Sequence, residues 1–174
     1  MTSGDPSSAP VVVTFVSTGE QDTDRLGGWL ADVLQSGDVV ALDGELGAGK
    51  TRLVRAVVAA LGADDQRASS PTFVLIQRYE GRIPIYHFDA YRIADVDEFL
   101  DLGAEEIFAE DGICFIEWAA RVAEALPPGI LRIEIRATGA NTREFLLTGA
   151  ETRSIAIVRA IQARINAAAQ SPGR

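Results

Sequence analysis

Residues Gly44–Thr51 place three glycines, a lysine and a threonine in the spacing G-x-x-x-x-G-K-T. Glycines in such a loop let the backbone turn tightly and present successive N–H groups to phosphate oxygens. The lysine can reach the terminal phosphates of a nucleotide, and the threonine hydroxyl can ligate magnesium. The spacing therefore predicts a phosphate-binding loop. The residues assigned to it are Gly44, Gly47, Ala48, Gly49, Lys50, Thr51 and Arg52.

Lys50 is the only lysine among the 16 lysine and arginine residues of the chain. Lysine is a compact point charge on a flexible stem, whereas arginine is a planar fork. A loop wrapped closely around a polyphosphate has room for the lysine. The alternative is a glycine-rich turn that carries a lysine by chance.

The segments on both sides of the loop argue against that alternative. Val39–Asp43 is a short apolar run of the kind that forms a buried strand. Leu53–Leu61 has the pattern of a helix, and Gly62 lies where a helix C-terminal glycine is expected. Strand, glycine-rich loop and helix are the order in which phosphate loops occur.

Two further apolar runs end in an acid, Ile85–Asp89 and Ile113–Glu117. A phosphate loop needs a second carboxylate to hold the metal or to orient the attacking group. Either acid could instead cap the segment that follows it. From the residues alone, the assignment of metal binding and water orientation to Asp89 and Glu117 stays open.

Three nearby features allow two interpretations each. His87, the only histidine, is either a proton acceptor or a hydrogen-bonded core residue, and the absence of a visible Ser or Cys partner favours the core role. Trp118 either lines the nucleotide pocket or packs in the core. Ser69–Thr72 either contacts the γ-phosphate or forms a proline turn before a strand.

The remaining elements must position these residues. Val11–Val16 predicts a strand, and Thr23–Leu34 a helix with Thr23 as its N-cap. Phe73–Tyr79 and Ile83–Phe88 predict a hairpin, in which Pro84 favours an edge position for the second strand.

The second half of the chain continues the alternation of helices and strands. Alternation of this kind predicts an α/β sheet with helices on its faces, and the hairpin makes part of it antiparallel. The predicted elements are a helical stretch over Asp95–Ala109 with a break near Gly103, a short helix over Ala119–Leu126, strands over Leu131–Arg136 and Phe145–Leu147, and a closing helix over Thr152–Ala168.

Composition sets outer limits on function. The net charge is −9, so tight, sequence-independent binding of nucleic acid by the chain itself is not expected. Cys114 is the only cysteine, which excludes an internal disulfide and fits a reducing compartment and a small core residue. With no apolar stretch of membrane-spanning length and no recognisable signal peptide, we expect a cytoplasmic protein without a membrane partner.

The ordered set of motifs resembles the TsaE (YjeE) family of small bacterial P-loop ATPases. Besides the phosphate loop, the matching pieces are Ser70-Pro71-Thr72, His87-x-Asp89-x-Tyr91-Arg92 and Glu117-Trp118. The resemblance extends from about Val11 to Ile165. Ala90 replaces a common leucine and Ala119 a common proline of the family, and neither touches the proposed chemistry.

This resemblance implies an activity that spacing could not give. It implies an ATP- and Mg²⁺-dependent ATPase of low turnover, needed for threonylcarbamoylation of adenosine 37 in tRNAs that read ANN codons. Its implied partners are the TsaB and TsaD proteins, with tRNA reached only through them, and the chain would be monomeric alone. By position, Lys50, Asp89 and Glu117 become catalytic and Thr51 and Glu117 metal ligands. Thr72, Trp118 and Arg143 join the nucleotide-binding residues.

The implied fold is an α/β, P-loop NTPase-like three-layer sandwich, with a mixed, mostly parallel sheet and helices on both faces. We expect a disordered tail over 1–10, one ATPase domain over 11–168 and a flexible tail over 169–174. Two other functions remain: a small-molecule kinase that uses the same loop, and a nucleotide-gated binding module whose hydrolysis is incidental. The absence of an obvious lid insertion weighs against the kinase.

Overall fold

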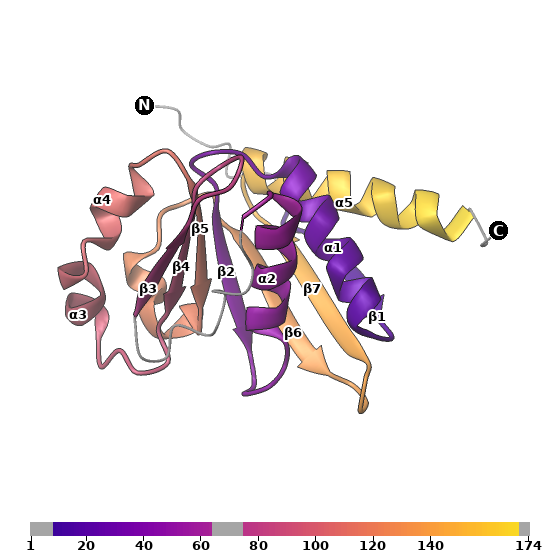
Figure 1. The fold of residues 1–174 in the computed structure, drawn as a ribbon, viewed down its shortest axis with the longest axis horizontal. Helices are drawn as coiled ribbons and strands as arrows, with labels where there is room; N and C mark the ends of the chain where they lie inside the picture. Colours follow the sequence, from indigo (N-terminus) through magenta and orange to yellow (C-terminus); the bar gives the residue numbers. More distant parts are fainter. Residues whose placement is uncertain (1–8, 64–74, 171–174) are drawn as a thin grey trace.

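The computed structural model describes residues 9–63 and 75–170. Within these residues, one seven-stranded sheet has the strand order β1-β7-β6-β2-β5-β4-β3 (Figure 1). The strands are β1 (Val11–Ser17), β2 (Val39–Gly44), β3 (Ile76–Tyr79), β4 (Ile85–Asp89), β5 (Ile113–Glu117), β6 (Leu131–Ala137) and β7 (Arg143–Gly149). The helices are α1 (Glu20–Val33), α2 (Lys50–Ala60), α3 (Val96–Asp101), α4 (Ala104–Phe108), the 3₁₀ helix η2 (Ala119–Ala125) and α5 (Thr152–Gln170).

The centre of the sheet is parallel and both of its edges are antiparallel. Strands β6, β2, β5 and β4 run parallel to one another, whereas β7 is antiparallel to β6 and β1, and β3 is antiparallel to β4. In the described part of the chain, five of the seven strands therefore run in the same direction. The predicted α/β fold with a mixed, mostly parallel sheet is confirmed.

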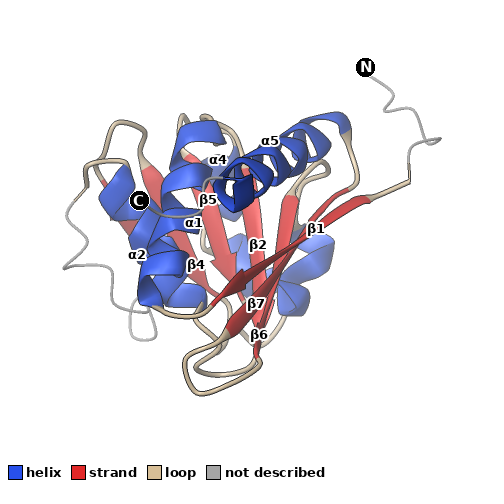
Figure 2. Ribbon diagram, turned by 90° about the vertical axis from the view of Figure 1, so that its right-hand side faces the viewer, coloured by secondary structure: helices blue, strands red, loops and turns tan. Residues whose placement is uncertain are grey.

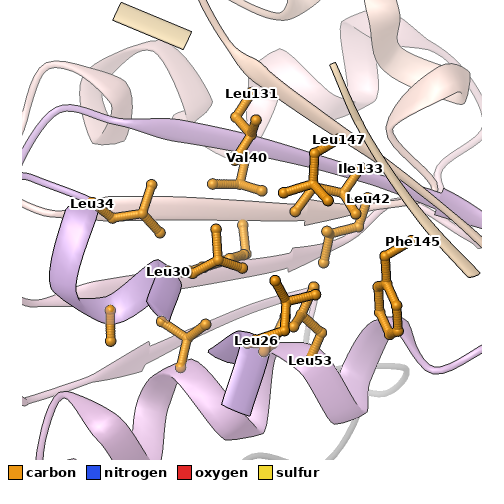
Figure 3. Packing of buried hydrophobic residues seen from close by; sticks show 14 of the residues in the cluster. Leu26, Leu30, Leu34, Val40, Leu42, Leu53, Leu131, Ile133, Phe145 and Leu147 are labelled. Carbon is orange, nitrogen blue, oxygen red and sulfur yellow. The ribbon is translucent and has the colours of Figure 1, made fainter. Parts of the chain in front are cut away.

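Helices cover both faces of the sheet (Figures 1 and 2). On one face, α1 and α2 pack apolar side chains such as Leu30 and Leu53 against Val40 and Leu42 of β2 (Figure 3). On the same face, α5 packs against β7 and β1. On the other face, α3, α4 and η2 form a second core around Phe99. Because successive strand residues point to opposite faces, a strand between two cores must be apolar throughout. Residues 39–42 of β2 meet this requirement.

Cys114 belongs to the second core, as predicted. Its side chain is 2% exposed, and burial raises the pKa of the thiol to about 12. The thiol is therefore protonated at neutral pH and lacks the nucleophilic thiolate form.

Glycines with special backbone angles shape the ends of several elements. Gly62 has φ +78 directly after the C-cap of α2, and Gly103 has φ +79 between α3 and α4, so both predicted breaks are confirmed. Gly44 lies so close to β6 that a Cβ would stand 2.4 Å from the carbonyl oxygen of Ile135. A side chain at position 44 would push the phosphate loop away from the sheet.

Two local predictions are wrong. Thr23 does not cap α1, which begins at Glu20 after Gly19; Thr23 is buried inside the helix, and its hydroxyl lies 3.0 Å from that of Ser17. Strand β4 is not an edge, because it lies between β5 and β3. Pro84 directly precedes that strand, a position at which a residue without an N–H is tolerated, and its carbonyl accepts a hydrogen bond from the N–H of Ile113.

No helix within 9–63 and 75–170 combines the length and the apolar character that crossing a membrane requires.

Candidate nucleotide-binding site

The two acids predicted at strand ends lie on neighbouring strands. In the parallel pairing of β4 with β5, Asp89 stands opposite Glu117, and Glu117 stands opposite Leu42 of β2. The carboxyl ends of parallel strands meet at one edge of a sheet, which is where ligands bind in open α/β folds. Both acids are almost fully buried. The phosphate loop, which follows β2, thus begins beside Glu117 of β5, and Asp89 lies on β4, the next strand of the sheet.

A cavity of about 290 Å³ joins these acids to the loop. Of the predicted site residues that the structure describes, most line this cavity. Its lining comprises Leu46, Gly47, Gly49, Lys50, Thr51, Arg52, Asp89, Tyr91, Glu117 and Trp118.

Glu117 is hydrogen-bonded on both sides. Its Oε1 accepts a hydrogen bond of 2.7 Å from the hydroxyl of Thr51, and Nε2 of His87 lies 2.8 Å from the same oxygen. A carboxylate only accepts, so Nε2 of His87 is the donor in this contact. The Nδ1 of His87 is buried and has no hydrogen-bond partner within the described residues. His87 is thus a hydrogen-bonded core residue, as favoured, and its partner is the candidate acid itself.

The side chain of Lys50 folds back over the loop and is held there by backbone carbonyls of the loop. Nζ donates to the carbonyl oxygens of Gly44 at 2.6 Å and Glu45 at 2.9 Å, and lies 3.9 Å from the centre of the Trp118 ring. Burial lowers the pKa of Lys50, and the negative charges of Glu117, Asp43 and Asp89 oppose that shift. The ammonium lies in the same cavity as Asp89 and Glu117.

Trp118 follows Glu117 in a left-handed conformation, with φ 59 and ψ 39. This conformation is costly for a bulky residue, by about 1–2 kcal/mol. It turns the chain from β5 into η2 and places the ring both in the cavity and against Tyr91, with ring centres 4.9 Å apart. Trp118 thus lines the cavity and also packs against the second core, and its contact with a nucleotide stays a prediction.

Asp89 is fixed by a local turn. Its Oδ1 accepts the N–H of Tyr91 at 2.9 Å, while the N–H of Ala90 donates to the carbonyl of Glu117 at 3.0 Å. These bonds join the ends of β4 and β5. The Asp89 carboxylate is thereby held at the cavity that contains Lys50.

A larger cavity of about 650 Å³ lies on the other side of the loop. Arg52 and Gly49 line both cavities, which makes the loop their common wall. Arg52 is paired with Asp24 of α1 at 2.7 Å, so its side chain is turned toward that helix. Gly47 also lines both cavities. The remaining lining residues of the larger cavity are Ser17, Thr18, Gly19, Glu20, Thr23, Arg55, Ala140, Asn141, Arg143 and Phe145.

Arg143 lines this larger cavity, where its Nε donates to the carbonyl of Ala48 at 3.0 Å. The predicted residue Thr72, with Ser70 and Pro71, lies outside the described residues. Among the described residues, no group of three or more His, Cys, Asp or Glu side chains could hold a metal. Any metal bound there would depend on few protein ligands, such as Thr51 and Glu117.

Sequence reasoning missed Asp43 and Arg55. Asp43 follows the apolar part of β2, contributes to the charge around Lys50 and accepts the N–H of Ala120 at 3.0 Å, so it anchors η2 beside the site. Its position directly before Gly44 was the available signal. Arg55 faces the larger cavity one helical turn after Thr51, and only the periodicity of α2 could have indicated this.

Comparison with known proteins supplies the family context. The family model described as "Threonylcarbamoyl adenosine biosynthesis protein TsaE" matches residues 17–145. A protein of Treponema pallidum named tRNA threonylcarbamoyladenosine biosynthesis protein TsaE is 42% identical over 74% of this chain and 95% of its own length. The protein of that name from Bacillus subtilis is 38% identical over 76% of this chain and 83% of its own length.

A solved structure is also similar. The crystal structure of Bacillus subtilis YdiB superposes with a TM-score of 0.76 at 29% sequence identity, covering 91% of this chain and 99% of the other. The sheet and the surrounding helices are thus shared over almost the whole of both chains.

Proposed function

Because the chain belongs to the TsaE family, we propose that it is a Mg²⁺-dependent ATPase of low turnover that supports threonylcarbamoylation of adenosine 37 in tRNAs reading ANN codons. In this proposal it works in the cytoplasm on the TsaB and TsaD proteins and reaches tRNA only through them. Relatives named for tRNA threonylcarbamoyladenosine biosynthesis support the pathway. The geometry of the loop and its acids supports the nucleotide chemistry.

One observation carries the ATPase proposal: the hydroxyl of Thr51 and the carboxylate of Glu117 lie 2.7 Å apart beside Lys50. Both are hard oxygen donors, the ligand type that magnesium prefers, and magnesium in such sites takes its other ligands from phosphates and water. The two residues therefore fit the ion. When bound, it would offset the negative charge of the β- and γ-phosphates.

The chain's own residues perform the rest. The loop N–H groups and the N-terminus of α2 would hold the phosphates. In the described contacts, two of the three N–H donors of the Lys50 ammonium go to loop carbonyls, which leaves the third for a phosphate oxygen. Asp89, held one strand away from Glu117, would accept a proton from the attacking water or orient it. Such catalysis is positioning and charge stabilisation, without a covalent intermediate.

The larger cavity is proposed to take the nucleoside. Its volume of about 650 Å³ falls within the usual range of small-molecule sites, about 300–1,000 Å³. The phosphate loop lines both this cavity and the smaller one that contains Lys50 and Thr51, so one ligand can occupy both. Trp118, on the opposite side of the loop, is then placed to contact the terminal phosphate region rather than the base.

The kinase alternative would use the same loop with arginines that close over an acceptor. Two arginines outside the loop are engaged elsewhere: Arg121 donates to the carbonyl of Ile93 at 3.0 Å, and Arg136 is paired with Glu134 at 2.8 Å. Both are contacts within the fold and away from the cavity.

The deciding experiment measures magnesium-dependent release of phosphate from ATP, with and without purified TsaB and TsaD. We expect weak hydrolysis by the chain alone, a change in rate with the partners, and loss of activity in Lys50→Ala. Arg136→Gln, on an exposed part of β6, serves as the charge-matched control and should retain activity. Transfer of phosphate to a small acceptor without the partners would instead support the kinase.

A second experiment separates the ATPase from a nucleotide-gated binding module. Glu117→Ala and Asp89→Ala are compared for ATP binding, hydrolysis and threonylcarbamoylation of tRNA in the reconstituted system. If hydrolysis is the function, variants that bind ATP without hydrolysing it should not sustain repeated rounds of modification. Full modification by a variant with no hydrolysis would establish the binding module.

A further inference from the structure

We propose that Arg143 is a positioning residue for the phosphate loop: its guanidinium holds the Ala48–Gly49 peptide so that the N–H of Gly49 faces the nucleotide phosphates. This inference rests on the proposed nucleotide binding and deepens it. The family resemblance implied that Arg143 touches the nucleotide. The contacts point instead to an action through the backbone of the loop.

Arg143 joins two loops with one planar group. Its Nε donates to the carbonyl of Ala48 in the phosphate loop at 3.0 Å. Its NH1 donates to the carbonyls of Gly139 and Thr142, each at 3.0 Å, in the turn between β6 and β7. A guanidinium holds its N–H donors in a fixed plane. The position of the Ala48 carbonyl is thereby tied to the end of the β6–β7 hairpin.

The geometry of the peptide bond carries this constraint to the phosphate side. The described residues contain no cis peptide bonds, and in a trans peptide the C=O and N–H point in opposite directions. The Ala48 carbonyl faces Arg143, which lines the larger cavity. The Gly49 N–H therefore points away from Arg143, toward the smaller cavity that Lys50 and Thr51 line.

This peptide needs support from outside the loop. Gly47 and Gly49 stand on either side of Ala48 with φ of +76 and +115, and glycine passes between backbone conformations that other residues cannot adopt. The base of the loop is fixed, because Gly44 packs on the carbonyl of Ile135. Arg143 supplies the corresponding fixed point at the far end of the loop.

The test compares Arg143→Gln, Arg143→Lys and Arg136→Gln with the unchanged protein. Calorimetry measures the binding of ADP, and a competition assay measures that of adenosine. We expect Arg143→Gln to bind ADP about tenfold more weakly, the equivalent of one lost hydrogen bond to a charged group, with adenosine binding unchanged. Arg143→Lys should also lose affinity, because one ammonium cannot span both loops. Arg136→Gln removes the same charge from β6, has no contact with the loop, and should bind normally.

A residue-specific measurement is the NMR chemical shift of the Gly49 amide in ¹⁵N-labelled protein. Addition of ADP should shift this amide strongly in the unchanged protein and much less in Arg143→Gln. A merely structural role would alter thermal stability without this selective loss. Thermal unfolding checks each variant, and Arg143→Lys decides the matter should Arg143→Gln fail to fold.

Several outcomes would overturn the inference. Equal losses for ADP and adenosine would mean that Arg143 contacts the nucleoside directly. Normal ADP binding by Arg143→Lys would mean that only its charge matters, and an undiminished Gly49 shift in Arg143→Gln would remove the positioning role. Failure of the unchanged protein to bind ADP is a separate result, which would overturn the proposed function itself.

Discussion

At the scale of single residues, Glu117 is the most heavily constrained side chain of the site. Its Oε1 accepts hydrogen bonds from the hydroxyl of Thr51, in the phosphate loop, and from Nε2 of His87, on the neighbouring strand. The Thr51 bond is the one that a metal would rearrange, whereas the His87 bond lies inside the sheet, where His87 is fully buried. We therefore interpret His87 as the residue that keeps the carboxylate in place when its other partner changes.

The substitution His87→Leu should lower the free energy of unfolding by about 1.5–3 kcal/mol, because a buried carboxylate loses a donor. His87→Gln keeps an N–H donor on a side chain of similar reach and should lose less. Urea unfolding followed by circular dichroism measures both variants. Equal stability of His87→Leu and the unchanged protein would show that this hydrogen bond does not support the fold.

At the scale of elements, helices α1 and α2 approach each other through a glycine. A Cβ at Gly27 would stand 2.3 Å from the Cβ of Ala56, while a Cβ at Gly28 would meet nothing within 4 Å. The close approach brings α1 against the helix that begins at Lys50. The packing of α1 thus helps to set the position of the phosphate-binding end of α2.

These adjacent glycines allow a matched comparison. Gly27→Ala should destabilise the protein by about 1–3 kcal/mol through overpacking. Gly28→Ala should be neutral or stabilising by up to about 1 kcal/mol, since alanine is the better helix former. Thermal unfolding of the two variants gives the answer, and similar shifts for both would contradict the close packing.

The helix α5 is attached to the start of β2 by a charged contact. Arg153 donates from Nε to Asp38 at 2.9 Å and from NH2 to the carbonyl of Val33 at 2.8 Å. Asp38 is 9% exposed, so its carboxylate has little access to water. The contact therefore joins a late helix to an early loop.

We expect Arg153→Gln and Asp38→Asn each to destabilise the protein, with the double variant less affected than the sum of the two. The coupling should be about 1 kcal/mol, the upper end for a pair in which one partner is well exposed. A cycle of urea unfolding measurements on the four proteins determines it. Strict additivity would mean that the two side chains contribute independently.

At the scale of the whole molecule, the charge decides what the chain can bind by itself. A net charge of −9 repels a phosphate backbone, and tight binding to nucleic acid depends on displaced counterions around basic patches. In the proposed role in tRNA modification, other proteins would then hold the tRNA. This agrees with a proposed action on partner proteins.

Gel-shift titration with tRNA should accordingly show no retention by the chain alone at about 150 mM salt, with or without ATP. Retention should appear only when the partners are added. A salt-sensitive complex of tRNA with the isolated chain would contradict this and would point to a local basic surface.

The sequence predicted the fold and the two acids because both depend on local patterns: apolar runs of strand length, an acid at the end of each, and glycines at the turns. It could not say which of Asp89 and Glu117 lies nearer the phosphate loop, because that depends on which strand lies beside β2. The strand order also explains the error at Pro84, since a proline just before a strand and a proline on an edge give the same local pattern. Thr23 failed as a cap because Gly19 and Glu20 begin the helix one turn earlier.

The pairing of β1 with β7 has a consequence for synthesis on the ribosome. Residues 11–17 emerge first, yet their only strand partner in the described sheet is residues 143–149. At about 5–20 residues per second the nascent strand waits on the order of ten seconds. During that time a β-branched segment, whose Val12 and Val16 remain half exposed even in the finished fold, has an unsatisfied edge. We therefore expect this early strand to need protection by chaperones until residues 143–149 have been made.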